Sequence, residues 1–354
     1  MSISNSSKFP IVVIGAGAAG IYFSTKLGKI KEILLLESGP SKSFIENDKR
    51  NNYTTNKKRP YRCGHIGRVR GYGGATNIWG GQMLPFDENT FSFKKGWPIL
   101  FSELKPFYES VSKTLLNEPF SFGIKKLINK KMYEKLFLHK SFYIHISKWI
   151  PNPIFRLTIG KILPSKVKLL EKITVIAIEP NSDGNYSLHC KDGNSKNLII
   201  KASNVVISTG TIETVRLLKF SKEYYGLPVK KEIGKGFMDH LSFLEGICSL
   251  KPRNRWSLLK LFNTKITKKG QRSSVRITTK VAGTNIGEDL AASFSIAVLS
   301  PSQKWQRLIN NLISISSILS FGFVFKPFGK IILTGIFEQN AYNKKRYIDL
   351  GKDN

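Results

Sequence analysis

Apolar runs alternate with polar, glycine-rich segments along the first forty residues of the chain. The run IVVI at 11–14 predicts a buried strand over about 10–15, and AAGIYFSTKLG predicts a helix over about 18–28. The run KEILLLE predicts a second strand over about 32–37. A strand, a helix and a second strand in this order begin a doubly wound parallel sheet, so we expect the first domain to be of the α/β class.

Later in the chain, short strand patterns dominate. From Val167, the segments KLLEKITVIAIEP, NYSLHC and LIIKASNVVISTG predict successive strands, with Asp183-Gly184 and Asp192-Gly193 in the hairpin turns. Beyond about 240, the alternation in SSVRITTKVAG and AASFSIAVLS is typical of strands with one buried face. The second half is therefore expected to be mostly antiparallel β-structure.

Three glycines separate the first predicted strand from its helix. Gly15 permits a tight turn, Gly17 permits a close approach of backbone to a diphosphate, and Gly20 lets the helix pack on the strand. Glu37 ends the second strand, where a carboxylate can accept hydrogen bonds from both ribose hydroxyls of an adenosine. These features predict a dinucleotide site, and they leave FAD and NAD open.

Two further segments carry candidate chemistry. The glycine-dense run GYGGATNIWGGQ at 71–82 suits a backbone pressed against a diphosphate or a flavin ring, the alternative being a flexible surface loop. The run NVVISTGTIETVRLL at 204–218 predicts a buried strand that turns directly into a helix at Thr209-Gly210. Alone, it could be any strand–helix unit.

In this order the three segments resemble the glucose–methanol–choline family of FAD-dependent oxidoreductases. GWPI at 96–99, IGKGFMDH at 233–240 and EQNAYNKKRYIDL at 338–350 are also similar to that family, in matching order. The resemblance implies a Rossmann-like FAD/NAD(P)-binding domain of residues 1–119 and 166–240. It also implies a partial, mostly antiparallel substrate domain of residues 241–354. Residues 120–165 are expected to form a basic, aromatic insertion or cap.

The resemblance resolves the cofactor in favour of FAD. Some family members attach the flavin through a His just before the loop tryptophan, and Ile78 stands there in this chain, so the FAD is expected to be non-covalent. No metal is expected. The residues implied to hold FAD are Gly15, Gly17, Ala18, Gly20, Glu37, Gly73, Gly74, Thr76, Asn77, Val175, Thr209 and Gly210.

The implied reaction is oxidation of a CH–OH group of an alcohol or sugar, with hydride transfer to flavin N5 and an unknown electron acceptor. In the family a His near the C-terminus removes the hydroxyl proton, and this chain ends at Asn354, before the matching region. We therefore expect the catalytic part to be missing and this chain to be potentially inactive. No catalytic residue is assigned among the five histidines His65, His139, His145, His189 and His240.

Composition leaves a rival interpretation open. The formal net charge of +32 is concentrated in segments such as 251–280, which contains no acid. Such a surface could attract an anionic membrane or polysaccharide, so the rival is a non-catalytic, basic, nucleotide-binding module. No nucleic-acid motif accompanies the charge, so no nucleic-acid partner is expected.

Location is predicted from weak signals. The three cysteines lack metal-type spacing and the N-terminus MSISNSSKFP lacks a signal-peptide pattern, which favours the cytoplasm. The stretch 308–325, LINNLISISSILSFGFVF, is diluted by Asn and Ser, and we expect a packed helix or strand pair in place of a membrane span. Peripheral membrane contact stays open.

Overall fold

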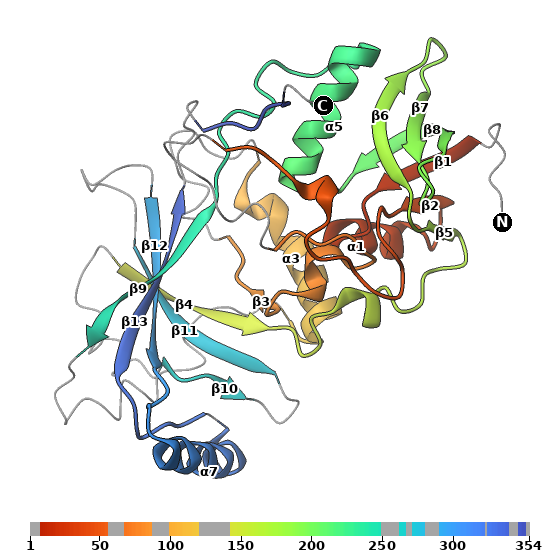
Figure 1. Ribbon diagram of the computed structural model, residues 1–354. Helices are drawn as coiled ribbons and strands as arrows, with labels where there is room; N and C mark the ends of the chain where they lie inside the picture. The colour runs from red at the N-terminus through yellow and green to blue at the C-terminus, as the bar shows by residue number, and fades with distance from the viewer. Residues whose placement is uncertain are drawn as a thin grey trace. The chain divides into compact units, whose positions relative to one another are not determined.

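The computed structural model describes residues 8–55, 67–86, 99–119, 142–248, 262–266, 271–279, 290–322, 324–339 and 346–351. The chain forms two compact units, each with its own sheet (Figure 1). Unit 1 contains Met1–Gly80, Asn152–Phe237 and Asn343–Asn354, and unit 2 contains Gly81–Pro151 and Met238–Tyr342.

Unit 1 is built on a sheet of order β5-β2-β1-β8-β7-β6. Strands β5, β2, β1 and β8 run parallel, whereas β6, β7 and β8 form an antiparallel meander. The bounds are β1 Lys8–Ile14, β2 Ile33–Leu36, β5 Val167–Leu170, β6 Thr174–Pro180, β7 Tyr186–Lys191 and β8 Asn197–Ile207. The predicted α/β class is confirmed by this largely parallel arrangement.

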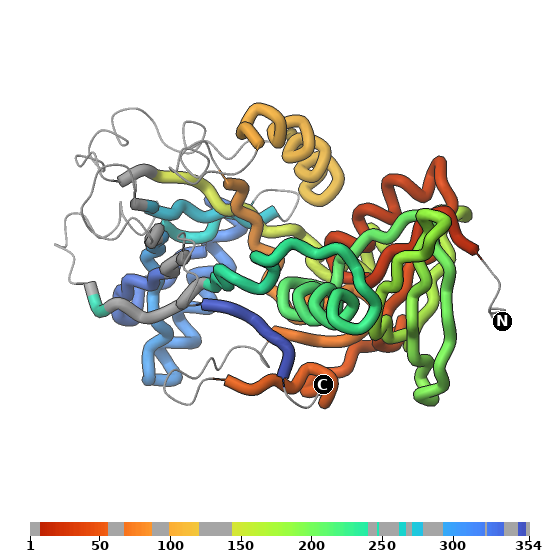
Figure 2. The backbone as a smooth tube through the Cα atoms, turned by 90° about the horizontal axis from the view of Figure 1, so that it is seen from above, coloured from red at the N-terminus to blue at the C-terminus, as the bar shows by residue number. Residues whose placement is uncertain are grey.

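Strand β8 holds the two parts of this sheet together. Its first half pairs with β7 from Asn197 to Ala202, and its second half pairs with β1 up to Ile207. The meander then packs with α5 (Thr211–Tyr225) on one side of β1 and β2, as Figure 2 shows from above. Their shared core contains Val12, Ile14, Leu34, Leu36, Ile178, Leu188, Ile200, Ala202 and Leu217.

The glycine motif leads into α1 (Ala18–Leu27) as the sequence predicts. Alternation along a strand sends Val13 and Leu35 to the face opposite this shared core, and both side chains are fully buried. Ile21 of α1 is fully buried as well, and α1 packs on β1 and β2. Both faces of the parallel strands are thus covered, which explains their near-continuous apolar sequence.

Unit 2 contains a seven-stranded sheet of order β3-β4-β11-β12-β13-β9, in which β10 also pairs with β11. All its described pairings are antiparallel, which confirms the predicted β-structure of the second half. The bounds are β3 Gln82–Met83, β4 Phe142–Trp149, β9 His240–Cys248, β10 Lys265–Ile266, β11 Arg272–Thr279, β12 Leu290–Val298 and β13 Ile331–Gln339. Helices α3 (Phe101–Leu116) and α7 (Lys304–Phe321) complete the unit.

The unit boundaries differ from the predicted domain boundaries in three places. Residues 81–119 belong to unit 2, since β3 pairs with β4. Part of the predicted insertion at 120–165 is strand β4, which pairs along its length with β11, whereas residues 152–165 belong to unit 1. Residues 343–354 return to unit 1, where the N–H groups of Gly236 and Phe237 donate to the carbonyl of Arg346.

No helix among the described residues is long and apolar enough to cross a membrane. The stretch 308–325 lies mostly within α7, so the helical alternative for this segment is confirmed.

The meander core gives a direct test of stability. Leu188 of β7 is fully buried in the shared core, so Leu188→Ala should lower the free energy of unfolding by about 2–5 kcal/mol. Ile199→Ala on β8 is the matched control, since Ile199 is 39% exposed, and should cost about 1 kcal/mol or less. Urea unfolding followed by far-UV circular dichroism measures both. Equal losses for the two variants would contradict the packing described.

Candidate functional site

The three predicted glycine segments meet at the carboxyl ends of β1 and β8. The backbone of Gly15 lies so close to β8 that a Cβ added there would come within 2.7 Å of the Ser208 carbonyl oxygen. A Cβ on Gly20 would lie 2.0 Å from the carbonyl oxygen of Gly15. Both positions require glycine, and for Gly15 a φ of +95° adds a second reason. The predicted tight turn and close packing are therefore present.

The second glycine segment packs directly on the first. The Gly73 N–H donates to the Ala16 carbonyl at 2.8 Å, and a Cβ on Gly74 would lie 2.9 Å from the Gly17 Cα. Gly73 and Gly74 both have positive φ angles, which a side chain would disfavour. Gly73 and Gly74 thus pack on the first glycine segment, which favours the predicted site over the alternative of a flexible surface loop.

The third segment closes the site from β8. Ser208 donates from its hydroxyl to the carbonyl oxygens of Ile14 and Gly15, at 2.9 and 2.7 Å. A Cβ on Gly15 would also lie 3.1 Å from the Thr209 Cα, which places Thr209-Gly210 beside the first glycine turn. Gly210 is the N-cap of α5 with a φ of +77°. Sequence reasoning missed the role of the Ser208 hydroxyl, which could only be recognised once β1 and β8 were known to be neighbours.

Helix α1 has backbone donors at its start that find no acceptor among the described residues. Its N-cap, Gly17, makes no side-chain capping bond, and the first turn contains no acid. The first N–H groups of a helix lack intrahelical partners, and the helix dipole makes this end positive. A Cβ on Gly17 would meet no atom of the described residues within 4 Å. The space beside Gly17 is therefore suited to an anionic group.

Glu37 is the charged group at the centre of the site. Its side chain is only 6% exposed, and its Oε1 accepts from the N–H groups of Gly39 and Gly71 at 2.9 and 3.0 Å. The Ser38 hydroxyl also donates to Oε1, and the Ala16 N–H donates to Oε2 at 3.0 Å. Among the described residues, Oε2 thus accepts one hydrogen bond. Since Oε1 accepts three hydrogen bonds and Oε2 one, Oε2 is the oxygen that retains capacity for a ligand hydroxyl.

Two predicted cofactor residues instead support the loop that contains them. The Thr76 hydroxyl donates to the Gly73 carbonyl and accepts from the Phe155 N–H. The Asn77 amide donates to the carbonyls of Tyr72 and Gly74. These side chains fix the shape of the 71–77 loop, so their expected role toward a cofactor stays a prediction.

Val175 is buried at the start of β6, two residues after Ile173, which contacts Glu37. The Ile173 N–H donates to the Glu37 carbonyl, and the Val175 carbonyl accepts from Arg216 at 3.3 Å. The Val175 carbonyl, one of the two backbone groups that could meet adenine, therefore already has a partner from α5. Its assigned contact stays a prediction.

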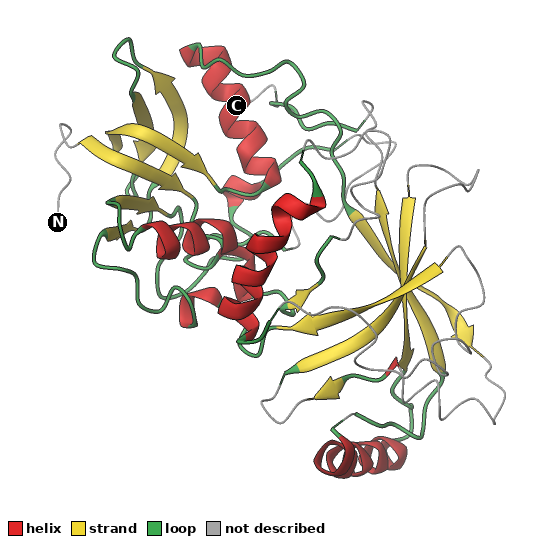
Figure 3. Cartoon of the chain, turned by 180° about the vertical axis from the view of Figure 1, so that it is seen from behind, coloured by secondary structure: helices red, strands yellow, loops and turns green. Residues whose placement is uncertain are grey.

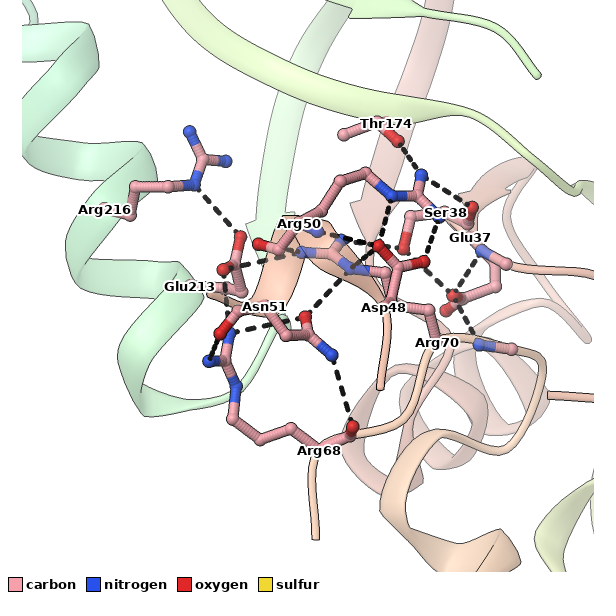
Figure 4. Close-up of polar contacts among 12 residues, drawn as sticks. Glu37, Ser38, Asp48, Arg50, Asn51, Arg68, Arg70, Thr174, Glu213 and Arg216 are labelled. Atoms are coloured by element: carbon pink, nitrogen blue, oxygen red, sulfur yellow. Dashed lines mark hydrogen bonds and ion pairs between the residues drawn. The ribbon is translucent and has the colours of Figure 1, made fainter. Parts of the chain in front are cut away.

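An arginine–acid cluster beside Glu37 was not foreseen from the sequence (Figure 4). Glu213, in the first turn of α5, lies 2.9 Å from Arg68, 3.5 Å from Arg70 and 3.0 Å from Arg216. Burial alone would raise the pKa of Glu213, but the surrounding arginines outweigh burial and lower it. The only sequence signal was the pair Arg68 and Arg70 directly before the glycine-dense run.

The same cluster reaches the loop that follows β2. Asp48 pairs with Arg50, whose guanidinium also donates to the Thr174 hydroxyl at 2.9 Å. Arg70 donates to the Ser38 hydroxyl at 3.0 Å, next to Glu37. The cluster thus holds together the loop after β2, the segment 68–70, the start of β6 and the start of α5, and so restricts the position of the loop that carries Glu37.

The histidines remain unassigned. His189 stacks on Tyr225 and lies 2.7 Å from Glu179 at the far side of the meander, and His145 is on β4 near Thr278. His65 and His139 lie outside the described residues, as does the side chain of His240. No group of His, Cys, Asp or Glu in the described part of the chain could hold a metal ion.

The chain is similar to solved structures of other proteins. No family model matches the chain, and no curated protein matches it. A pyridoxine 4-oxidase from Mesorbium loti has a TM-score of 0.49 at 14% identity, covering 93% of this chain and 71% of that protein. A fungal aryl-alcohol oxidase has a TM-score of 0.44 at 14% identity, covering 66% of this chain and 52% of that protein.

The arginine cluster predicts a large effect of one substitution. Glu213→Gln leaves three arginines without their shared carboxylate, and should lower the free energy of unfolding by about 3 kcal/mol at neutral pH. Glu223→Gln, at an exposed position of the same helix, is the control and should change it by less than about 0.5 kcal/mol. A lowered pKa gives stability that is lost as pH falls through it, so the difference from wild type should shrink in acid. Urea unfolding across pH tests both statements.

Glu37 predicts the opposite pH dependence. Burial raises the pKa of Glu37 above its ordinary value of 4.5, although four hydrogen bonds partly lower it. The folded protein therefore binds this proton more tightly than the unfolded chain, and this contribution to stability is lost as pH rises above 4.5. Glu37→Gln should destabilise the protein by about 1–3 kcal/mol, since one acceptor becomes a donor facing N–H groups. It should also flatten the fall in unfolding free energy as the pH rises above 4.5. An unchanged slope would contradict the assignment.

Proposed function

We propose that this chain is an FAD-dependent oxidoreductase that acts on CH–OH groups of alcohols or sugars and binds FAD non-covalently. The observation that supports it most is the convergence of Gly15–Gly20, Gly71–Gly74 and Ser208–Gly210 around one helix N-terminus. Three glycine-containing backbone segments permit the close approach that a dinucleotide diphosphate requires. The N–H groups at the start of α1 suit the diphosphate of an ADP moiety, and the Glu37 carboxylate suits its ribose hydroxyls.

The proposed roles follow from the groups available. The N–H groups at the start of α1 would bind the diphosphate, and the Cβ-free space at Gly17 would let it approach. Glu37 would accept from a ribose hydroxyl through Oε2, while its other bonds hold the surrounding loops in place. A carboxylate at the end of β2 disfavours a 2′-phosphate by repulsion, so an NADP-type ligand fits less well.

When bound, FAD supplies the acceptor for the hydride of the alcohol carbon. The chain's own contribution in unit 1 is to bind and orient: the arginine cluster fixes Glu37, and Thr76 and Asn77 fix the 71–77 loop. The base that removes the hydroxyl proton is not assigned to any residue. The alcohol or sugar substrate, the electron acceptor and a cytoplasmic location remain parts of the proposal that the chemistry of unit 1 does not specify.

The cofactor proposal is tested by Gly17→Ala. The added methyl group meets no atom of the described residues within 4 Å, and the φ of −80° is ordinary for alanine. We therefore expect unfolding of the cofactor-free protein to be unchanged within about 0.5 kcal/mol. FAD affinity, measured by flavin fluorescence titration, should fall about tenfold or more because the methyl group takes the space of the diphosphate. Gly246→Ala, on β9 and equally uncrowded, is the control and should leave FAD affinity unchanged.

The activity is tested separately on the purified full chain loaded with FAD. Anaerobic addition of alcohols or sugars should bleach the flavin absorbance if the chain can oxidise them. Flavin binding without bleaching would support the cofactor site and contradict oxidation by this chain. Tight NADH binding without flavin binding would overturn the proposal in favour of a nicotinamide-linked enzyme.

A further inference from the structure

Helix α7 of unit 2 presents a stripe of large apolar side chains to solvent, while its inward side combines buried polar residues with the half-buried Ile309, Ile313 and Ile318. Its buried residues are Asn310, Ser314 and Ser317, which are 3%, 8% and 8% exposed. Its large exposed side chains are Trp305 at 53%, Leu308 at 61%, Leu312 at 58%, Ile315 at 57% and Leu319 at 82%. A surface helix ordinarily buries its largest apolar side chains, so the exposure of this stripe is unusual.

Specific hydrogen bonds fix this orientation. The Asn310 amide donates to the Phe328 carbonyl at 2.9 Å and accepts from the Phe328 N–H at 2.9 Å. The Ser314 hydroxyl donates to the Phe325 carbonyl at 2.6 Å. Rolling the helix to bury its leucines would break all three bonds and leave backbone groups of 325–328 unpaired. The outward direction of the leucines is therefore built into the fold.

The exposed side chains form one continuous stripe. Their spacing alternates between three and four residues from Trp305 to Leu319, which places them on one face along four turns of the helix. Figure 3 shows α7 at the edge of unit 2, beyond the ends of its strands. A stripe of five large apolar side chains on one helix marks an interaction surface.

The surroundings of the stripe are basic. Lys304 and Arg307 are exposed in the first turn of α7, which contains no acid, and Lys330 is exposed just before β13. The sequence from Leu290 to Phe337 contains no Asp or Glu. The positive end of the helix dipole adds to these charges instead of being neutralised. Lys304, Arg307 and Lys330 thus give the segment that contains the stripe a positive charge, and no acid in residues 290–337 compensates it.

We propose that α7 docks this unit on an anionic lipid bilayer, lying in the plane of the membrane. Trp305, Leu308, Leu312, Ile315 and Leu319 enter the boundary between headgroups and acyl chains, and Lys304 and Arg307 contact lipid phosphates. An apolar face with Trp and Leu beside cationic side chains is the chemistry of interfacial helices. A net charge of +32 attracts the chain to an anionic surface and opposes pairing of this face with a second copy of the same chain.

The full chain is tested by co-sedimentation with vesicles of phosphatidylcholine and phosphatidylglycerol. The apolar variant is Leu312→Ser with Leu319→Ser, which keeps every charge. The matched control is Ile30→Ser with Ile162→Ser, two exposed apolar side chains of unit 1. Far-UV circular dichroism and urea unfolding verify that both variants fold as wild type does.

The proposal expects wild type and the control to bind, and the Leu312/Leu319 variant to lose affinity about tenfold or more. Lys304→Gln with Arg307→Gln should lower affinity about tenfold at low salt, and less at about 0.5 M salt, where charges are screened. Pure phosphatidylcholine vesicles should bind more weakly than anionic ones.

Three results overturn the proposal. Equal binding of the Leu312/Leu319 variant and wild type would mean that net charge alone attracts the protein. Absence of binding to anionic vesicles would exclude the bilayer as the occupant. A dimer of wild type in sedimentation velocity that the Leu312/Leu319 variant loses, without vesicle binding, would assign the stripe to a second copy.

Discussion

The buried carboxylate of Glu37 is the constraint on which unit 1 depends. A charge taken out of water is costly unless hydrogen bonds replace its hydration, and here four donors do so. Three of the donors are backbone N–H groups from three separate segments, the turn after β1, the turn after β2 and the loop at Gly71. The same charge therefore satisfies its own hydrogen-bonding needs and fixes three loops relative to one another.

The close approach of glycine backbones is the second part of this arrangement. Gly15 lies against Ser208, and Gly74 lies against Gly17, at distances that leave no room for a Cβ. Gly17 differs from Gly15, Gly20 and Gly74, since a Cβ there would contact no atom of the described residues within 4 Å. Packing therefore explains why Gly15, Gly20 and Gly74 are glycines, whereas at Gly17 the backbone leaves space beside the first turn of α1.

Helix α7 of unit 2 differs from the helices of unit 1 in the side chains that it exposes. In unit 1, α1 and α5 cover the sheet with apolar residues such as Ile21 and Leu217, which are buried. In unit 2, α7 is attached through Asn310 and Ser314, which leaves its apolar stripe in solvent. The mean hydropathy of a helical segment cannot distinguish a helix that buries its apolar residues from one that exposes them. The direction of its polar side chains decides whether the helix supports the core or forms a contact surface.

The sequence by itself determined the local elements of unit 1. The strands before and after the glycine motif, the helix between them, and the hairpins at Asp183-Gly184 and Asp192-Gly193 depend on periodicity and turn chemistry, which act over a few residues. The glycine positions also followed from local backbone requirements. The convergence of the three glycine segments was expected through a family resemblance, and the structure places them together.

Only the tertiary structure decided the long-range features. Arg68 meets Glu213 across 145 positions of sequence, and Phe142–Trp149 joins β11 although its composition predicted an insertion. The outward face of α7 depends on bonds to the carbonyls of Phe325 and Phe328, which no helical periodicity encodes. Local patterns specify which backbone conformation a segment adopts. The partners of its polar and charged groups depend on segments that only folding brings near.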